Sequence, residues 1–162
     1  MADGLTRIKE TLLQECEIVT SLAESKTRCK RKGVGCQLTR FHERGMLALP
    51  AVYNGPAHED LKCTGEIGNC GCMHSEPQAI IDCLKRPYNN YKFILLCTYS
   101  PCTNCANIII NSGIVEGVVY DILTEHDKRG DEILRKFMPV VTIEDIRNGH
   151  VDAILSSWIN SY

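Results

Sequence analysis

Two short segments of this chain restrict what it can fold into more than any other feature: His-x-Glu at 74–76 and Pro-Cys-x-x-Cys at 101–105. They offer one imidazole and two thiolates, a donor set that suits zinc better than magnesium or calcium. Three ligands rather than four leave one position for a water molecule, whose pKa zinc lowers to about 7. Glu76 lies where a general acid/base belongs. We therefore predict a catalytic zinc site with His74, Cys102 and Cys105 as ligands and Glu76 as proton carrier.

Both segments are predicted to begin helices. Pro77 suits the first turn of a helix, where its missing N–H leaves no hydrogen bond unmade. Ser100 and Pro101 look like an N-cap and a first helical residue ahead of Cys102. The partial positive charge of a helix N-terminus favours thiolate over thiol. The alternative is a structural Cys-x-x-Cys pair beside an unrelated histidine, and the coincidence of two motifs at two helix starts argues against it.

Composition excludes several classes of protein. A net charge of −2 and 6% aromatic residues argue against the basic, aromatic surface with which proteins bind nucleic acid. No apolar run approaches membrane-spanning length, so we expect no membrane contact. We find no signal peptide and expect a cytoplasmic protein, in which the ten cysteines are metal ligands or buried hydrophobes rather than disulfides. The length predicts a single domain over 1–162.

Hydrophobic periodicity predicts an α/β protein. Helices are expected over 5–26, from near His74 to Leu84, and over 102–112, 127–136 and 151–159. Strands are expected over 34–38, 46–52, 91–98, 115–120 and 140–143. This order predicts a three-layer α/β/α sandwich with a mixed five-stranded sheet, in which the later strands are parallel. The apolar face at 151–159 could pack on this sheet or on another subunit, and both alternatives stay open.

Four segments together carry a family resemblance: Tyr53-Asn54-Gly55, His74 to Ile80, Ser100 to Ala106 and Gly113 to Tyr120. With them the chain resembles the cytidine deaminase superfamily and, more narrowly, the deoxycytidylate (dCMP) deaminases. The resemblance implies a cytidine deaminase-like fold, a small-molecule nucleotide substrate and a homo-oligomer. It also implies zinc-dependent hydrolysis of dCMP to dUMP and ammonia, a step in pyrimidine nucleotide supply.

The resemblance also implies roles for residues around the zinc ligands. Asn54 would hydrogen-bond the sugar, and main-chain groups of Ser75 and Ser100 would face the base. Arg28 would bind the phosphate, whereas most of the basic run at 28–32 is expected to be solvated. Some dCMP deaminases carry a second, structural zinc, and the residues that would hold it here are Cys29, Cys63, Cys70 and Cys72. Free buried thiols are the alternative for these four.

Four other functions are alternatives to the deamination of dCMP. Deamination of dCTP, deoxycytidine or another nucleoside is the nearest, and Arg28 and Asn54 discriminate among these substrates. The acidic balance argues against a polynucleotide deaminase. An inactive, zinc-stapled binding module would not need Glu76. A redox protein built on Cys102 and Cys105 would leave His74 without a role.

Overall fold

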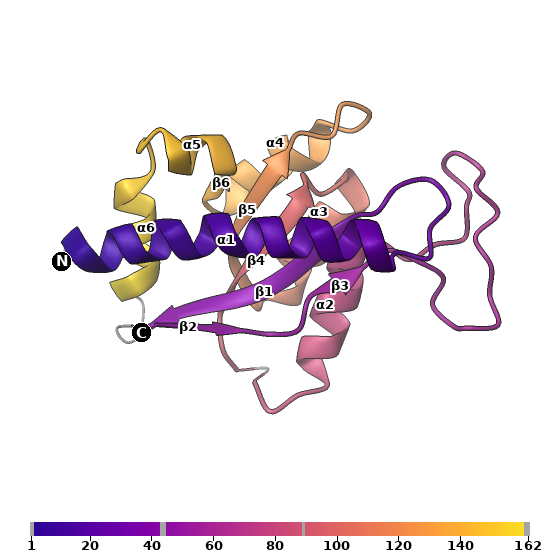
Figure 1. The fold of residues 1–162 in the computed structure, drawn as a ribbon, viewed down its shortest axis with the longest axis horizontal. Helices are drawn as coiled ribbons and strands as arrows, with labels where there is room; N and C mark the ends of the chain where they lie inside the picture. Colours follow the sequence, from indigo (N-terminus) through magenta and orange to yellow (C-terminus); the bar gives the residue numbers. More distant parts are fainter. Residues whose placement is uncertain (1, 43–44, 89, 161–162) are drawn as a thin grey trace.

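The computed structural model of the protein describes residues 2–42, 45–88 and 90–160 (Figure 1). The helices within these residues are α1 (Ala2–Lys26), α2 (Ser75–Leu84), α3 (Thr103–Ser112), α4 (Arg129–Phe137), α5 (Ile143–Arg147) and α6 (Asp152–Asn160). The strands are β1 (Gly35–His42), β2 (Gly45–Ala48), β3 (Val52–Tyr53), β4 (Phe93–Tyr99), β5 (Val115–Ile122) and β6 (Val140–Thr142). The five predicted helices are present, and the short α5 was not predicted.

The strands form one mixed sheet in the order β2-β1-β4-β5-β6, with β3 also paired to β1. β1 is antiparallel to β2, β3 and β4, whereas β4, β5 and β6 are parallel, as predicted for the second half of the chain. The described residues contain six strands rather than the predicted five, because the strand expected over 46–52 is split into β2 and β3. The N–H of Leu49 still bonds the Leu38 carbonyl at 2.9 Å. Pro50 follows with no N–H to donate, which interrupts the ladder.

Helices cover both faces of this sheet (Figure 1). α1, α5 and α6 pack on one face, and α2, α3 and α4 pack on the other. β4 is apolar from Phe93 to Cys97 because alternate side chains point to opposite faces, and here both faces are buried. Leu95 and Cys97 lie in the core on the α2 side, whereas Ile94 and Leu96 lie in the core on the α1 side. The predicted three-layer α/β/α architecture is confirmed.

The apolar face of α6 packs within the chain. Leu155 is fully buried and Trp158 is 3% exposed, and both belong to the core cluster that α1 forms with β4 and β5. The choice left open by the sequence is therefore decided for most of this face, which covers its own sheet. α5 precedes it and begins with a capping box, in which Thr142 and Asp145 satisfy each other's backbone N–H groups.

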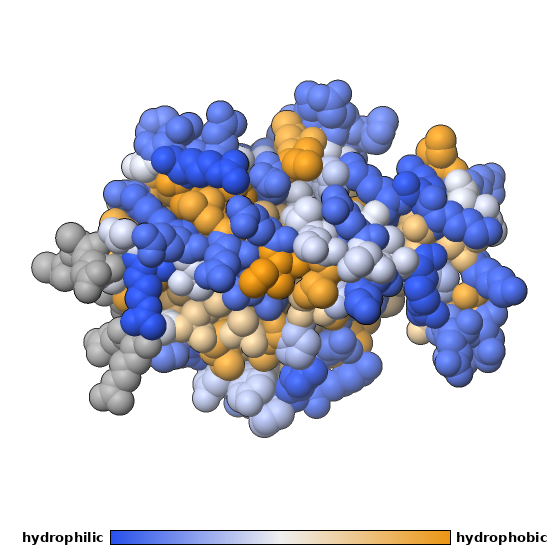
Figure 2. All heavy atoms as spheres, in the orientation of Figure 1, coloured by the Kyte–Doolittle hydropathy of each residue, from blue (hydrophilic) through white to orange (hydrophobic). Residues whose placement is uncertain are grey.

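The surface in the view of Figure 1 is mixed in character. Figure 2 shows hydrophilic residues over most of it, with apolar residues gathered toward the middle. The loop 55–73, which projects to one side, is mostly hydrophilic, although Leu61 and Ile67 are exposed there. Among the described helices, none has both the length and the apolar content needed to cross a membrane.

The topology brings three loops to one edge of the sheet. β4 and β5 are parallel, so the segments that follow them, 100–102 and 123–128, leave the sheet at the same edge. β1 is antiparallel to β4, so the segment before it, 27–34, meets them there, and the N–H of Gly35 donates to Thr98 Oγ1 at 3.1 Å. Ligands of α/β proteins bind in crevices at the carboxyl ends of strands. A ligand site is therefore expected at this edge.

Candidate active site

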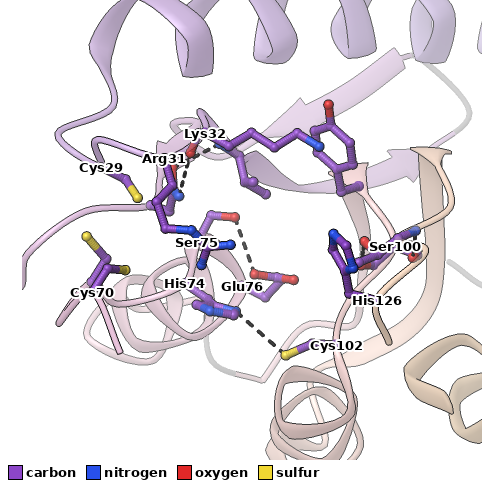
Figure 3. Close-up of a pocket in the computed structure, with 15 residues that line it drawn as sticks. Cys29, Arg31, Lys32, Cys70, His74, Ser75, Glu76, Ser100, Cys102 and His126 are labelled. Carbon is purple, nitrogen blue, oxygen red and sulfur yellow. Dashed lines mark hydrogen bonds between the residues drawn. The ribbon is translucent and has the colours of Figure 1, made fainter. Parts of the chain in front are cut away.

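Three potential metal ligands meet at this edge, and we call them the ligand triad: His74, Cys102 and Cys105. His74 is the N-cap of α2, Cys102 is the N-cap of α3, and Cys105 lies in the first turn of α3. The Nδ1 atom of His74 lies 3.6 Å from Cys102 Sγ (Figure 3). The same atom lies 3.3 Å from Cys105 Sγ. Tetrahedral zinc with bonds of about 2.0 Å to nitrogen and 2.3 Å to sulfur places such donors about 3.5 Å apart. The donor set and its spacing therefore fit one zinc ion with a fourth position open.

The N-cap of helix α3 lies two residues after the predicted one. Cys102 rather than Ser100 is the N-cap, with extended backbone angles of −69° and 170°, and Thr103 is the first helical residue. The Ser100 hydroxyl accepts a hydrogen bond from the N–H of Thr124 at 2.7 Å, so it serves the loop after β5 instead of capping α3. The Cys102 side chain makes no capping hydrogen bond. Its sulfur is thus available to bind a metal ion together with His74 and Cys105.

Glu76 is buried beside the triad. It is 3% exposed, and the Ser75 hydroxyl donates to its Oε2 atom at 3.3 Å (Figure 3). Burial raises the pKa of the Glu76 carboxyl, because water no longer solvates the charged form. It lies in the first turn of α2, two residues after His74, so the helix holds it beside the triad. A carboxyl held in this way can accept and return a proton at the metal site.

The two triad thiols have very different proton affinities. A hydrogen bond with Cys105 lowers the pKa of the Cys102 thiol to about 4, and the same bond raises the pKa of Cys105. The hydrogen bond with Cys102 raises the pKa of His74. Metal binding to such a cluster displaces the remaining protons, because thiolates and neutral imidazoles are the ligating forms.

A pocket of about 200 Å³ lies over Glu76 and two of the triad residues. Nine of the residues singled out from the sequence for catalysis, zinc or substrate line it: Cys29, Asn54, Cys70, Cys72, His74, Ser75, Glu76, Ser100 and Cys102. Six others in the lining were not assigned a role from the sequence: Arg31, Lys32, Val34, Tyr99, Thr124 and His126. Figure 3 shows His126 beside Ser100, on the far side of Glu76 from the loop that carries Arg31.

Arg28 is not part of this lining. Its guanidinium donates to the carbonyl oxygen of Pro56 at 2.5 Å and to that of His58 at 3.5 Å. It therefore ties the segment after α1 to the start of the loop 55–73. This placement does not support the expectation that Arg28 binds the phosphate of a substrate.

The cations that do line the pocket are Arg31 and Lys32. The Lys32 ammonium lies over the ring of Tyr99, 3.3 Å from its centroid, in a cation–π contact. In Figure 3 the Arg31 side chain extends toward Ser75, and Lys32 starts from the same loop and runs across the upper part of the view. The run of basic residues at 28–32 gives no sign of which members face a site. The pairing of β1 with β4, which brings this run beside the end of β4, is the signal that could have identified them.

Asn54 organises the loop that carries these cations. Its Oδ1 atom accepts hydrogen bonds from the Thr27 hydroxyl at 2.8 Å and from the N–H of Val34 at 2.9 Å. Its Nδ2 atom donates to the Lys32 carbonyl at 2.8 Å. The amide therefore links both ends of the loop 27–34, and one further N–H of Nδ2 is left for a ligand.

A second sulfur site lies on loops next to the pocket, and we call it the four-cysteine cluster: Cys29, Cys63, Cys70 and Cys72. Its four sulfur atoms lie within 4.8 Å of one another, with Cys63 Sγ 3.9 Å from Cys29 Sγ. The N–H of Lys30 donates to Cys63 Sγ at 3.3 Å, and this bond lowers the pKa of Cys63 to about 7. Tetrahedral zinc with four sulfur ligands requires S···S distances of about 3.8 Å. The cluster thus fits a closed site with no open position.

The chain is similar in sequence to known deaminases. Residues 8–121 match the family model described as the cytidine and deoxycytidylate deaminase zinc-binding region. The chain belongs to this deaminase family. It is 28% identical over 131 residues to the deoxycytidylate deaminase of Schizosaccharomyces pombe and 26% identical over 129 residues to that of Saccharomyces cerevisiae. Each match covers 72% of this chain and 39% of the relative, so the chain spans about two fifths of the length of these relatives.

Solved structures of deaminases share its fold. The dCMP deaminase of cyanophage S-TIM5 in its apo form superposes with a TM-score of 0.62 at 26% identity, covering 83% of this chain and 96% of that one. The same enzyme in complex with dCMP and dUMP gives a TM-score of 0.64 over the same shares of the two chains, at 24% identity. The resemblance and the cytidine deaminase-like fold predicted from the motifs are confirmed.

Proposed function

We propose that this chain catalyses the hydrolytic deamination of dCMP to dUMP, with release of ammonia, using a zinc ion held by the ligand triad. The observation that carries the proposal is the place of Glu76, buried in the pocket and two residues from a triad ligand. A zinc ion that only stabilises the fold needs no carboxylate there. Membership of the deaminase family and the similarity to a dCMP deaminase support the reaction and the class of substrate.

The chemistry divides between the metal and the chain. Zinc bound by one imidazole and two thiolates supplies hydroxide near neutral pH, because it lowers the pKa of water. Glu76 takes the proton of the attacking water and passes it to the ring nitrogen beside the amino-bearing carbon. When the new C–O bond has formed, Glu76 transfers the second proton to the exocyclic amine, the C–N bond breaks, and ammonia leaves. The Ser75 hydroxyl, 3.3 Å from Glu76 Oε2, holds the carboxylate in place for both transfers.

The pocket also offers contacts for the base and the sugar. Ser75 and Ser100 line opposite sides of it (Figure 3) and present main-chain groups to a base lying over Glu76. The free N–H of Asn54 Nδ2 is a donor for a sugar hydroxyl. Because the same amide links the ends of the loop 27–34, Asn54 would set the position of the sugar contact and of the neighbouring cations together.

We place the 5′-phosphate at Arg31 and Lys32 rather than at Arg28. Both side chains line the pocket, whereas the Arg28 guanidinium is bonded to two main-chain carbonyl groups of the loop 55–73. A phosphate monoester carries a charge of about −1.5 to −2 near neutral pH, which two adjacent cations can balance. Arginine binds such a group bidentately, and lysine acts on it as a point charge. Their position therefore favours a nucleotide over a nucleoside as substrate.

We also propose that the four-cysteine cluster binds a second, structural zinc ion. Its members come from the segment after α1 and from the loop 55–73, so one metal ion would fasten this loop to the rest of the chain. Cys72 lies two residues before His74, and Cys29 lies two residues before Arg31. A zinc ion in this cluster would thus stiffen two segments that carry the proposed site.

The experiment is to incubate the zinc-loaded chain with deoxycytidine, dCMP, dCTP, cytidine and CMP and to measure ammonia release. We expect the highest kcat/KM for dCMP. Equal values for deoxycytidine and dCMP would overturn the nucleotide assignment, and a preference for dCTP would overturn the single phosphate. No ammonia from any of these substrates would overturn the deaminase activity of this chain.

A further inference from the structure

The loop between β5 and α4, residues 123–128, holds the segment that contains two of the triad ligands. The N–H of Thr124 donates to Ser100 Oγ at 2.7 Å, and the Thr124 hydroxyl donates to the Ser100 carbonyl at 3.0 Å. Three residues further on, the Asp127 carboxylate accepts from the N–H and from the hydroxyl of Thr103, each at 2.7 Å. These bonds flank the Pro-Cys pair of the motif on both sides.

The start of α4 packs against the same segment. Gly130 leaves no room for a side chain, because a Cβ atom there would lie 2.6 Å from the carbonyl carbon of Cys102 and would collide with the Pro101 carbonyl oxygen. This close approach places Asp127, just before α4, at the first turn of α3. The contact is therefore built from backbone packing as well as from hydrogen bonds.

Helix α3 needs an acceptor from elsewhere because its own N-cap is otherwise engaged. The first four N–H groups of a helix have no partner within it, and an N-cap side chain usually accepts from one of them. The Cys102 side chain makes no such bond and points its sulfur at His74. Asp127, 24 residues along the chain from Thr103, accepts from the first helical N–H instead, and its negative charge is favourable at a helix N-terminus.

We propose that Asp127 is a positioning residue for the zinc site: it fixes Thr103, and through Thr103 it fixes the direction in which Cys102 and Cys105 face His74. Asp127 does not line the pocket, so it acts on the ligands through α3 and not on the substrate. The inference rests on the proposed zinc site. Replacing partners of metal ligands weakens metal binding by about 10–100-fold in other proteins, and we expect a loss in this range.

The chain offers a matched control for a purely structural role. In α5 the Asp145 carboxylate accepts from the N–H of Thr142 at 3.1 Å and from its hydroxyl at 2.7 Å, so the same kind of Thr–Asp pair begins a helix that carries no proposed ligand. If both pairs only stabilise the fold, replacing either aspartate should lower stability without affecting zinc binding. If Asp127 positions the ligands, replacing Asp127 should also weaken zinc binding, whereas replacing Asp145 should not.

The experiment measures zinc affinity by competition with a chromogenic chelator in the wild type, Asp127→Asn and Asp145→Asn. Two zinc-binding steps are expected, one for the triad and one for the four-cysteine cluster. The step that is missing in Cys102→Ser is assigned to the triad. We expect Asp127→Asn to weaken this step at least tenfold, Thr103→Val to weaken it less, and Asp145→Asn to leave it within twofold of the wild type. The cobalt-substituted Asp127→Asn protein should show shifted visible absorption bands, since ligand geometry sets them.

Unchanged zinc affinity in a folded Asp127→Asn protein would overturn the inference, as would an equal loss in Asp145→Asn. Because Asp127→Asn could also unfold the chain, Thr103→Ser and Thr103→Val form a milder pair that differs in the hydroxyl. Equal zinc affinity in these two would count against the role of the Thr103 hydroxyl contact and hence against the proposal. Absence of dCMP turnover in the wild type, with zinc affinity still dependent on Asp127, would overturn the proposed function alone.

Discussion

The ligand triad and the four-cysteine cluster lie beside the same pocket but are built in different ways. The triad comes from two helix starts, which are fixed by α2 and α3 packing on the sheet. The four-cysteine cluster comes from loops, which lack such support on their own. The triad offers three donor atoms and would leave one position of a tetrahedral metal open beside a buried carboxyl, whereas the cluster offers four sulfur atoms.

The difference indicates what each site is for. A reactive metal needs rigid ligands and a free position, and helices that pack on a core supply the rigidity. A closed four-thiolate site supplies rigidity to the chain instead, because a metal that binds only the folded form stabilises it. Under the proposed assignment, a metal ion would order the loops of the four-cysteine cluster, whereas the packing of α2 and α3 orders the triad.

The largest expected effect separates proton transfer from metal binding. Glu76→Gln keeps the shape of the side chain and removes the proton carrier, so kcat for dCMP should fall at least about 100-fold while the zinc content stays unchanged. Steady-state ammonia release and metal analysis of the same sample measure both. Glu59→Gln, which changes an exposed carboxylate of the loop 55–73, is the control and should behave as the wild type. Near-normal turnover in Glu76→Gln would remove Glu76 from the mechanism.

The next effect concerns the two cations that line the pocket, Arg31 and Lys32, which lie between Cys29 and β1. Arg31→Ala and Lys32→Ala should each lower kcat/KM for dCMP about tenfold or more, since a hydrogen bond to a charged group contributes about 1.5–3 kcal/mol. The value for deoxycytidine, which has no phosphate, should change little. Arg28→Ala is the matched control, because its guanidinium faces the loop 55–73. A selective loss for dCMP in Arg28→Ala, but not in the other two variants, would return the phosphate to Arg28.

The smallest effect is at the start of α5, which carries none of the proposed metal ligands. The hydrogen bond from the Thr142 hydroxyl lowers the pKa of Asp145, so the carboxylate stabilises the fold above the ordinary aspartate pKa of about 4 and this stabilisation is lost as the pH falls further. Asp145→Asn should lower the melting temperature by about 1–3 °C at pH 7. The difference between the two proteins should shrink below pH 4. A difference in melting temperature that grows toward low pH would contradict this role of Asp145. Loss of metal at low pH affects the wild type and the variant equally, so it cancels in the difference.

The sequence predicted the sheet and the triad segments because these features depend on local patterns. The apolar run in β4 and the helix end at Gly113, which has a φ of 67°, are readable from neighbouring residues alone. The predicted cap at Ser100 was wrong because its hydroxyl serves Thr124, which is 24 residues away. The division of 46–52 at Pro50 has a local cause that the hydrophobic pattern concealed.

The phosphate site that we propose at Arg31 and Lys32 could not be predicted in the same way. Arg28, Arg31 and Lys32 have similar chemistry and lie in one short run, and only the hydrogen bonds of distant residues distinguish them. The carbonyl groups of the loop 55–73 engage Arg28, and the amide of Asn54 holds the Lys32 backbone in place. The short helix α5, by contrast, has a readable signal, since Thr142 and Asp145 have the spacing of a capping box.

The most direct test of the division between the two sites is the number of zinc ions per chain, measured together with dUMP formation in the wild type, Cys102→Ser and Cys63→Ser. We predict two zinc ions in the wild type and one in each variant. Cys102→Ser should lose turnover, whereas Cys63→Ser should melt at a lower temperature and still form dUMP below it. One zinc ion in the fully loaded wild type, or two ions with turnover unaffected in Cys102→Ser, would contradict the account.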